Sequence, residues 1–389
     1  MKRPLKILVA GYLIGFPLGG MAWMLMHYLA GLSRMGHEVV FLEDSSDWSY
    51  PFNPMQGTYV TDSTYGRQCL ARLFAHFDLT PKWAYYSAFE NQIYGLSWSE
   101  LDAFCSSADL LLNISGLLPL RETYLKCRVK ALIDTDPVFF QVKGANKASV
   151  LDYYKAHDHF FTYGCNLPLG QTPVPLLGLD WKPLVPPVIT SQWEPLDAPG
   201  NMYTTIGSWD SKDRDIELAG ERYCWRKSTE YEKILDLPRR VRPGVSFELA
   251  YSGMEEDGAK YEHFGWFIRH GYTISLDFLD YRDYIRHSRG EFTVAKEQNT
   301  RLKSGWFSDR AACYLASGRP VITQDTGFGT YLPTGEGLFS FNSLDDILCA
   351  IEALESDQAR HRAAARRIAV EHFEAETVLT GLLQEMDLA

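Results

Sequence analysis

The segment KSGWFSDRAACYLASGRPVITQDTGFG, residues 303–329, holds the densest group of residues able to do chemistry. It predicts a helix over 310–317 followed by a strand over 320–323. Ser308 and Asp309 precede that helix and can cap its N-terminus. Cationic side chains and a glycine turn beside a helix N-terminus favour an anion such as a diphosphate. We assign to this predicted site the residues Lys303, Ser308, Asp309, Arg310, Asp325, Thr326 and Gly327.

Arg310 has a second interpretation. It can form an ion pair with Asp309 or Glu291, which would make it a structural residue. A basic residue at a glycine-lined helix start nevertheless favours phosphate contact, and we expect Arg310 to bind the diphosphate.

The triplet Asp134-Thr135-Asp136 follows a predicted strand over 130–134. Alternate residues of an extended segment point the same way, so the two carboxylates could share a cation. Because the triplet is remote in sequence from residues 303–329, we interpret it as a metal-free loop. We assign Asp136 as the general base and His159 as the second candidate. The alternative is that Asp136 only caps the following segment, as Asp before Pro often does.

The N-terminal stretch from Ile7 to Met26 has no charged residue and is long enough to span a bilayer. Its repeated glycines and the lack of a signal-peptide cleavage site favour another interpretation. A buried strand over 5–10, a glycine loop, a helix over 21–35 and a second strand form a βαβ unit. Gly19 and Gly20 permit close backbone approach at the helix start, which suits an anion, or they only make a tight turn.

The rest of the chain repeats the α/β rhythm on both sides of a proline-rich connector. Strands are predicted over 110–114 and near 159–163, and ligands of open α/β sheets bind beyond the carboxyl ends of such strands. Ser115, Asp134, Asp136 and Gly164 should therefore share one rim with the glycine loop. Eight prolines between Pro168 and Pro199 cannot hold a regular helix or a central strand and indicate a semi-rigid connector. A second strand series begins at MYTTIGSW and includes SFELAYSG, YTISL, EFTVA and GLFSF. We predict two Rossmann-like domains, 1–185 and 201–374, joined by a linker over 186–200, with a cleft between them.

Composition narrows the function further. The chain has 389 residues, a formal net charge of −11 and seven scattered cysteines without CxxC spacing. That charge argues against a general binder of nucleic acid or anionic membranes. The cysteines indicate reduced thiols rather than disulfides or a zinc site, so we expect a cytoplasmic protein without a transmembrane segment.

With these elements in place, LASGRPVITQDTGFG resembles the donor-binding half of GT-B glycosyltransferases. GGMAWMLMHYLAGLSRMGHEVVFLED is similar to that family's glycine loop, helix and strand, and RRIAVEHF with the closing segment resembles its C-terminal helices. The resemblance implies that the helix over 375–389 packs back on the first domain. It implies that Lys227 in CWRKSTEYEKIL binds phosphate. Cys313 replaces an acidic residue of many members, and the resemblance makes Asp309, one turn earlier, the candidate ribose ligand.

The resemblance implies a glycosyltransferase of the hexosyltransferase type. The C-terminal half would bind a UDP-, dTDP- or GDP-sugar, and the N-terminal half would bind a small-molecule, glycan or natural-product acceptor and supply the base. Neither a metal nor a cofactor is expected. Two alternatives are a nucleotide-sugar 2-epimerase on the same fold and a two-lobed sugar-binding protein, which would need a signal peptide.

Overall fold

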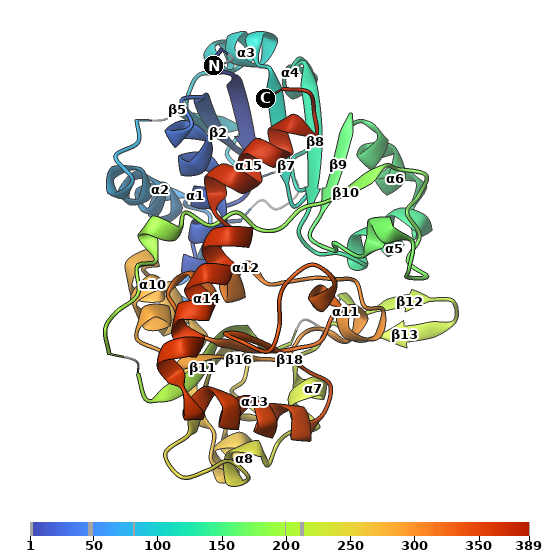
Figure 1. Cartoon of the computed structure of the whole chain (residues 1–389). Helices are drawn as coiled ribbons and strands as arrows, with labels where there is room; N and C mark the ends of the chain where they lie inside the picture. Colours follow the sequence, from blue (N-terminus) through green and yellow to red (C-terminus); the bar gives the residue numbers. More distant parts are fainter. Residues whose placement is uncertain (1–2, 46–49, 81, 199, 211–213, 389) are drawn as a thin grey trace.

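The computed structural model describes residues 3–45, 50–80, 82–198, 200–210 and 214–388, so residue 199 of the predicted linker lies outside the described part. Two open sheets dominate the fold, one in each half of the chain (Figure 1). The strands of the first are β1 (Lys6–Ala10), β2 (Glu38–Asp44), β5 (Lys82–Ser87), β6 (Gln92–Gly95), β7 (Leu110–Ile114), β8 (Val129–Asp134), β9 (His159–Thr162) and β10 (Trp181–Pro183). Those of the second are β11 (Met202–Ser208), β14 (Ser246–Ser252), β15 (Phe267–His270), β16 (Gly290–Thr293), β17 (Val321–Gln324) and β18 (Leu338–Phe341).

Both sheets have a doubly wound order. The first runs β10-β9-β8-β7-β1-β2-β5-β6 and the second β15-β14-β11-β16-β17-β18. All strand pairs within them are parallel except β5 with β6. The chain order reverses on either side of β1 and again on either side of β11. Such switch points are where open α/β sheets bind ligands, beyond the carboxyl ends of the strands. The predicted fold class of two Rossmann-like units is confirmed.

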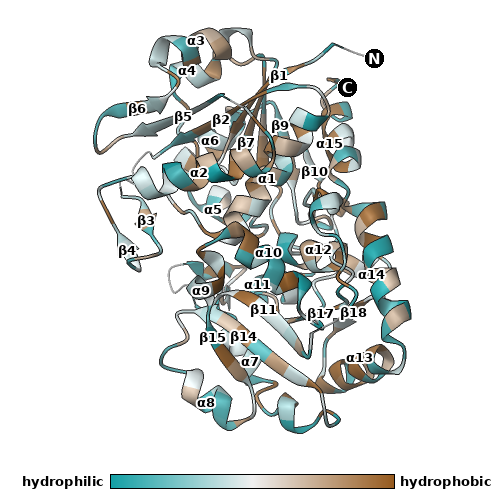
Figure 2. Cartoon of the chain, turned by 90° about the vertical axis from the view of Figure 1, so that its left-hand side faces the viewer, coloured by the Kyte–Doolittle hydropathy of each residue, from teal (hydrophilic) through white to brown (hydrophobic). Residues whose placement is uncertain are grey.

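Helices cover the faces of the sheets and connect their strands. In the first half they are α1 (Gly19–Arg34), α2 (Thr64–His76), α3 (Trp98–Ser107), α4 (Glu122–Leu125), α5 (Phe139–Asn146) and α6 (Ala148–Lys155). In the second half they are α7 (Ser228–Glu232), α8 (Gly258–His263), α9 (Gly271–Ser275), α10 (Phe278–Arg286), α11 (Glu297–Arg301), α12 (Asp309–Ala316), α13 (Leu344–Ser356), α14 (Gln358–His372) and α15 (Ala375–Gln384). Apolar residues colour the central strands, whereas the outer helix faces are hydrophilic (Figure 2). Two short hairpins, β3 (Phe52–Asn53) with β4 (Thr58–Tyr59) and β12 (Ile216–Leu218) with β13 (Glu221–Tyr223), stand apart from the sheets.

The chain ends on the half in which it begins. α14 packs along α12 of the second half, and α15 then crosses to lie against α1 (Figure 1). A Cβ atom on Gly31 would lie 2.6 Å from Leu379 Cδ1, so a larger residue there would require the Leu379 side chain to move.

Two local predictions are wrong. YTISL, predicted within the strand series, belongs to α9, and the strand beside β14 is the preceding segment, β15. The helix begins there because the His270 ring accepts a hydrogen bond from the Tyr272 backbone (3.3 Å) and the His270 carbonyl accepts one from Thr273 (2.7 Å). Ser308 does lie at the N-cap of α12, but its side chain makes no capping hydrogen bond. Within the described ranges, no helix is long and apolar enough to cross a membrane.

Candidate functional site

The two halves contact each other at the carboxyl ends of their strands. Gly164, just after β9, forms a bridge with Trp306, just before α12. The Asn166 side-chain amide donates to the backbone carbonyls of Lys303 (3.1 Å) and Gly327 (3.0 Å). These contacts turn the rim of the first sheet toward that of the second.

Asp136 lies on this rim and is paired with two cations from the other half. Its carboxylate is 3.2 Å from Lys296 Nζ and 3.4 Å from an Arg214 guanidinium nitrogen. Lys296 directly follows the β16 region and caps α11, and Arg214 precedes the β12–β13 hairpin. Lys296 Nζ also lies 3.2 Å from the centroid of the Trp225 ring, and the Arg214 guanidinium lies 5.3 Å from it. Two cations, one carboxylate and one indole ring thus meet between the halves.

Arg310 adopts its alternative contact in this structure. Its guanidinium pairs with Glu291 at 2.6 Å and donates to the carbonyl of Ile206 and the hydroxyl of Thr293. The Glu291 side chain is fully buried, and burial raises its pKa although Arg310 opposes that shift. A diphosphate role for Arg310 stays a prediction, and it would add to an ion pair that already uses much of the guanidinium.

Lys227 lies close to this ion pair. It is 8% exposed, and its ammonium group lies 5.3 Å from the centroid of the Tyr251 ring. Burial lowers its pKa well below the usual range, and the nearby cations Arg310 and Lys296 lower it further. Among the described residues, its ammonium group has no hydrogen-bonding or ion-pair partner. Such a group is ready to bind an anion.

Two further side chains face the same region. Asp309, in the first turn of α12, has a pKa raised by burial although the Arg310 charge opposes it. Burial raises the pKa of Tyr12, which follows β1, to about 12, and the charge of Asp136 contributes. The charges of Asp136 and Asp309 act on each other and on Tyr12 across the boundary between the halves.

The glycine loop after β1 is shaped by a carboxylate. Glu43 of β2 accepts hydrogen bonds at 2.6 Å from the backbone of Leu13, Ile14 and Gly15. At the start of α1, a Cβ on Gly19 would lie 2.6 Å from Tyr281 Cβ, so this glycine lets α10 pack closely. The role that we predict for Gly19 and Gly20 in binding the diphosphate stays a prediction.

The other predicted donor residues form a separate group. Lys303 Nζ is 2.8 Å from the Asp325 carboxylate, which also accepts from the Gly327 backbone (2.8 Å). Thr326 is buried, and its hydroxyl donates to the carbonyl of Trp306. The structure therefore brings Lys227, Asp309 and Arg310 together with Asp136, whereas Lys303 and Asp325 pair with each other.

Unlike Asp136, neither the Asp134 carboxylate nor His159 lies on the rim between the two halves. Asp134 is fully buried and accepts hydrogen bonds from Gln141 (2.8 Å), Thr162 (2.8 Å) and the Asp136 backbone (2.9 Å). Burial raises its pKa to about 7. His159 begins β9 opposite Ala131, three positions before the strand end, or about 10 Å from the rim. In the part of the chain that the structure describes, no group of three or more His, Cys, Asp or Glu side chains could hold a metal ion.

Arg214, Lys296 and Tyr12 were not among the residues predicted from sequence. Lys296 and Tyr12 each lie within three residues of the end of a central strand, so the strand-end rule could have found them. Arg214 has no such signal, because the hairpin that carries it is an excursion between β11 and α7.

Comparison with known proteins gives a match in structure alone. No protein-family model and no curated protein matches the sequence. HepE of Anabaena, solved with UDP and glucose, superimposes with a TM-score of 0.57 at 10% identity, covering 99% of this chain and 100% of that one. AviGT4, a glycosyltransferase involved in avilamycin A biosynthesis, gives 0.55 at 12% identity over 98% and 97%. Sucrose-phosphate synthase of Thermosynechococcus elongatus gives 0.53 at 11% identity over 98% of each chain. The chain thus has the GT-B fold of these glycosyltransferases.

Proposed function

We propose that this protein is a glycosyltransferase that moves a sugar from a nucleoside-diphosphate sugar to an acceptor hydroxyl. The observation that carries the proposal is Lys227 at the switch point of the second sheet, a residue only 8% exposed whose ammonium group has no hydrogen-bonding or ion-pair partner among the described residues. A buried cation of this kind is costly unless an anion binds it. The fold supports the same conclusion, since HepE, which shares it, was solved with UDP-glucose.

The donor diphosphate would lie between Lys227 and the first turn of α12. In the reaction, the acceptor oxygen forms a bond to the anomeric carbon while the bond from that carbon to the diphosphate breaks. The developing negative charge on the leaving diphosphate is stabilised by Lys227, with Arg310 and the backbone N–H groups of α12 contributing. We propose that these groups serve in place of a metal ion, and Asp309 is the candidate ligand for the ribose.

Asp136 is the proposed base. It lies on the rim of the first sheet, is 36% exposed and faces the second half. In an inverting transfer its carboxylate would accept the proton of the acceptor hydroxyl as that oxygen attacks. The fully buried Asp134, with three hydrogen bonds to its carboxylate, is poorly placed for that role.

A thermal-shift screen with UDP-, dTDP- and GDP-sugars tests donor binding. A ligand at 100 times its Kd should add about 2.7 kcal/mol of stability. The screen is repeated with EDTA, because a shift abolished by EDTA would restore a metal role. If no nucleotide sugar changes the Tm, the proposal is wrong. A new nucleotide sugar released without an acceptor would indicate an epimerase instead.

Asp136→Asn tests the base once an acceptor has been found. We expect kcat to fall about 10²- to 10⁴-fold with the fold of the protein unchanged. His159→Gln is the comparison variant, and the same loss there with normal turnover in Asp136→Asn would move the role to His159. Full activity in both variants would indicate a retaining mechanism, which needs no such base.

A further inference from the structure

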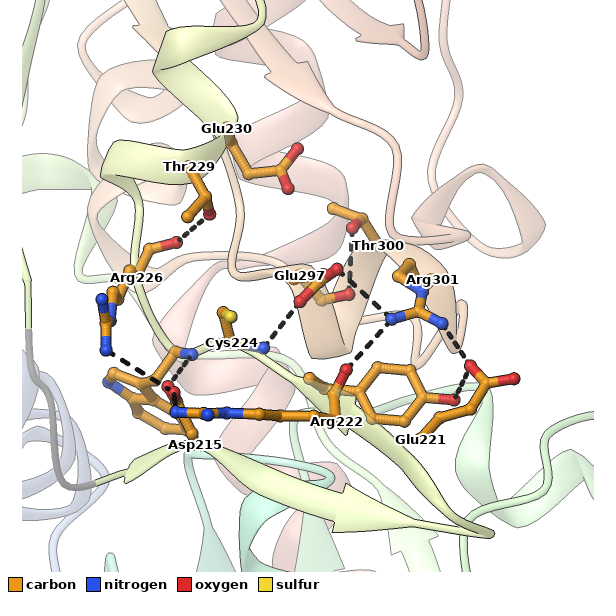
Figure 3. A network of polar contacts seen from close by, with 12 residues as sticks. Asp215, Glu221, Arg222, Cys224, Arg226, Thr229, Glu230, Glu297, Thr300 and Arg301 are labelled. Atoms are coloured by element: carbon orange, nitrogen blue, oxygen red, sulfur yellow. Dashed lines mark hydrogen bonds and ion pairs between the residues drawn. The ribbon is translucent and has the colours of Figure 1, made fainter.

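Hydrogen bonds and an ion pair join the β12–β13 hairpin to α11 (Figure 3). Glu297 of α11 accepts a hydrogen bond from the Cys224 backbone at 2.6 Å. Arg301 pairs with Glu221 and donates to the Arg222 carbonyl at 3.2 Å. These bonds join the hairpin that follows Arg214 to the helix that begins after Lys296.

The hairpin is also packed against the first half of the chain. Ile216 and Tyr223 of the hairpin share an apolar cluster with Val138 and Val142. Val138 directly precedes α5, and Val142 lies in it. The Arg214 guanidinium lies 5.7 Å from the ring centroid of Phe139, also in α5. The contact of Arg214 with Phe139 and the two ion pairs with Asp136 place both cations against the loop that carries Asp136.

This arrangement opposes the role of Asp136 as a base. Lys296 contacts one oxygen of the Asp136 carboxylate and Arg214 contacts the other, so both oxygens already have a partner where an acceptor hydroxyl would have to donate. The two ion pairs, at 3.2 and 3.4 Å, must loosen before Asp136 can take the proton of an acceptor. Both pairs are partly exposed, with Asp136 36% and Arg214 42% exposed, and such pairs are weak enough for a multivalent anion to replace.

Lys296 connects this group to the site of the diphosphate. Its ammonium group lies 3.2 Å from the centroid of the Trp225 ring, two residues before Lys227, and its charge acts on Lys227. A diphosphate bound at Lys227 carries more charge than one carboxylate and attracts the same cations.

We propose that Arg214 and Lys296 act as positioning residues that restrain Asp136 until the donor diphosphate binds them, so that the base is released only when the donor is in place. The proposal rests on the proposed function, and it predicts that the donor must bind before the acceptor can react. Asp136 and the diphosphate then compete for the same two cations. Trp225, which lies against both cations, reports on their movement.

Competition predicts that loss of the Asp136 charge strengthens diphosphate binding through Lys296, which the double variant with Lys296→Gln tests. Asp136→Asn should bind the nucleoside diphosphate more tightly than wild type, by roughly 2- to 10-fold, because two partly exposed ion pairs no longer oppose binding. The probe is whichever of UDP, dTDP or GDP stabilises the protein in the screen, titrated by calorimetry, and the matching nucleoside without phosphates is the control ligand. The affinity for this nucleoside should be the same in Asp136→Asn as in wild type.

Two matched variants separate the cations from the hairpin. Lys296→Gln should weaken diphosphate binding and abolish the tightening when combined with Asp136→Asn. Arg222→Gln removes an exposed cation of the same hairpin, one that pairs with Asp215 at 2.7 Å. It should change neither the affinity for the nucleoside diphosphate nor that for the nucleoside. The fluorescence of Trp225, taken as the difference between wild type and Trp225→Phe, should change on titration with the diphosphate and not with the nucleoside.

The outcomes are distinguishable. If no nucleoside diphosphate binds wild type, the proposed function fails. If one binds but Asp136→Asn binds it equally or more weakly, donor binding stands and the restraint of Asp136 is refuted. Unaltered Trp225 emission on saturation with the diphosphate would refute it independently.

Discussion

Replacing Lys227 by methionine should stabilise the folded protein and at the same time weaken nucleoside-diphosphate binding. Lys227 is 8% exposed, and its ammonium group lies beside Tyr251 without a hydrogen-bonding or ion-pair partner among the described residues. Its pKa is lowered by burial and by the neighbouring cations, which shows that the folded chain disfavours the charged form. Methionine keeps a similar length and apolar stem without the charge.

The two effects have opposite signs and estimable sizes. Removing a poorly compensated buried cation should raise the free energy of unfolding by about 1–3 kcal/mol. For domains of this size each kcal/mol raises the Tm by roughly 2–4 °C. Losing one charge-assisted contact to the diphosphate should cost about 1.5–3 kcal/mol of binding, or roughly 10- to 150-fold in Kd.

Thermal denaturation and calorimetric titration measure the two effects on the same preparation. Lys260→Met is the matched control, because Lys260 lies in α8, is 45% exposed and pairs with Glu232, which is itself 53% exposed. It should change stability by no more than about 0.5 kcal/mol and leave the Kd unaltered. A Lys227→Met protein less stable than wild type would show that the ammonium is well compensated. An unchanged Kd would remove Lys227 from the site.

Three further predictions follow from the same region and from the α1 interface. Arg310→Ala leaves the carboxylate of Glu291 buried without its partner, so we expect the free energy of unfolding to fall by about 3–5 kcal/mol in denaturation experiments. Most of that loss should be restored in the double variant Arg310→Ala/Glu291→Gln. Wild-type stability of the single variant would contradict the buried ion pair. Burial lowers the pKa of His27 to about 3, so the stability that the neutral imidazole contributes is present above about pH 6.5 and is lost as the pH falls. Wild type should therefore lose about 2 kcal/mol more stability between pH 7 and 5 than His27→Gln loses. A variant of the exposed His263 should show the same loss as wild type. A diphosphate bound at Lys227 favours the charged ammonium, so binding should take up protons, seen as a dependence of the calorimetric enthalpy on the buffer; equal proton uptake by Lys227→Met would exclude that residue as the source.

The central strands could be predicted because each is a continuous apolar run that only a strand buried on both faces explains. The predicted strand over 110–114 coincides with β7, and those over 5–10 and 130–134 differ from β1 and β8 by one residue. The prediction at YTISL was wrong because a pattern of alternating residues does not show that Gly271 lies against the backbone of β14, where a Cβ would come within 2.9 Å of the Ala250 carbonyl.

The site could be predicted only in part, because contacts between residues that are distant in sequence complete it. Asp136 was placed on the rim because strand ends converge at one edge of a parallel sheet. The partner of Arg310 was one of two alternatives that the sequence left open, and the structure shows Glu291. Nothing local in the sequence indicates that Arg214 reaches Asp136, since a hairpin and the α5 cluster place it there.

Cys313 shows how one helix can serve both the interface and the site. In the family that the sequence resembles, many members have an acidic residue at this position. Here Cys313 is buried, and its sulfur lies 3.7 Å from Nε2 of His27 in α1, whose other ring nitrogen accepts a hydrogen bond from the Ile189 backbone (3.1 Å). This face of α12 therefore joins the two halves through neutral groups, since burial raises the pKa of the thiol and lowers that of the imidazole. Because Nδ1 of the neutral His27 ring accepts, its Nε2 carries the proton and donates toward the sulfur of Cys313. The acidic side chain of α12 lies one turn earlier, at Asp309, where the charges of Arg310 and Asp136 act on it.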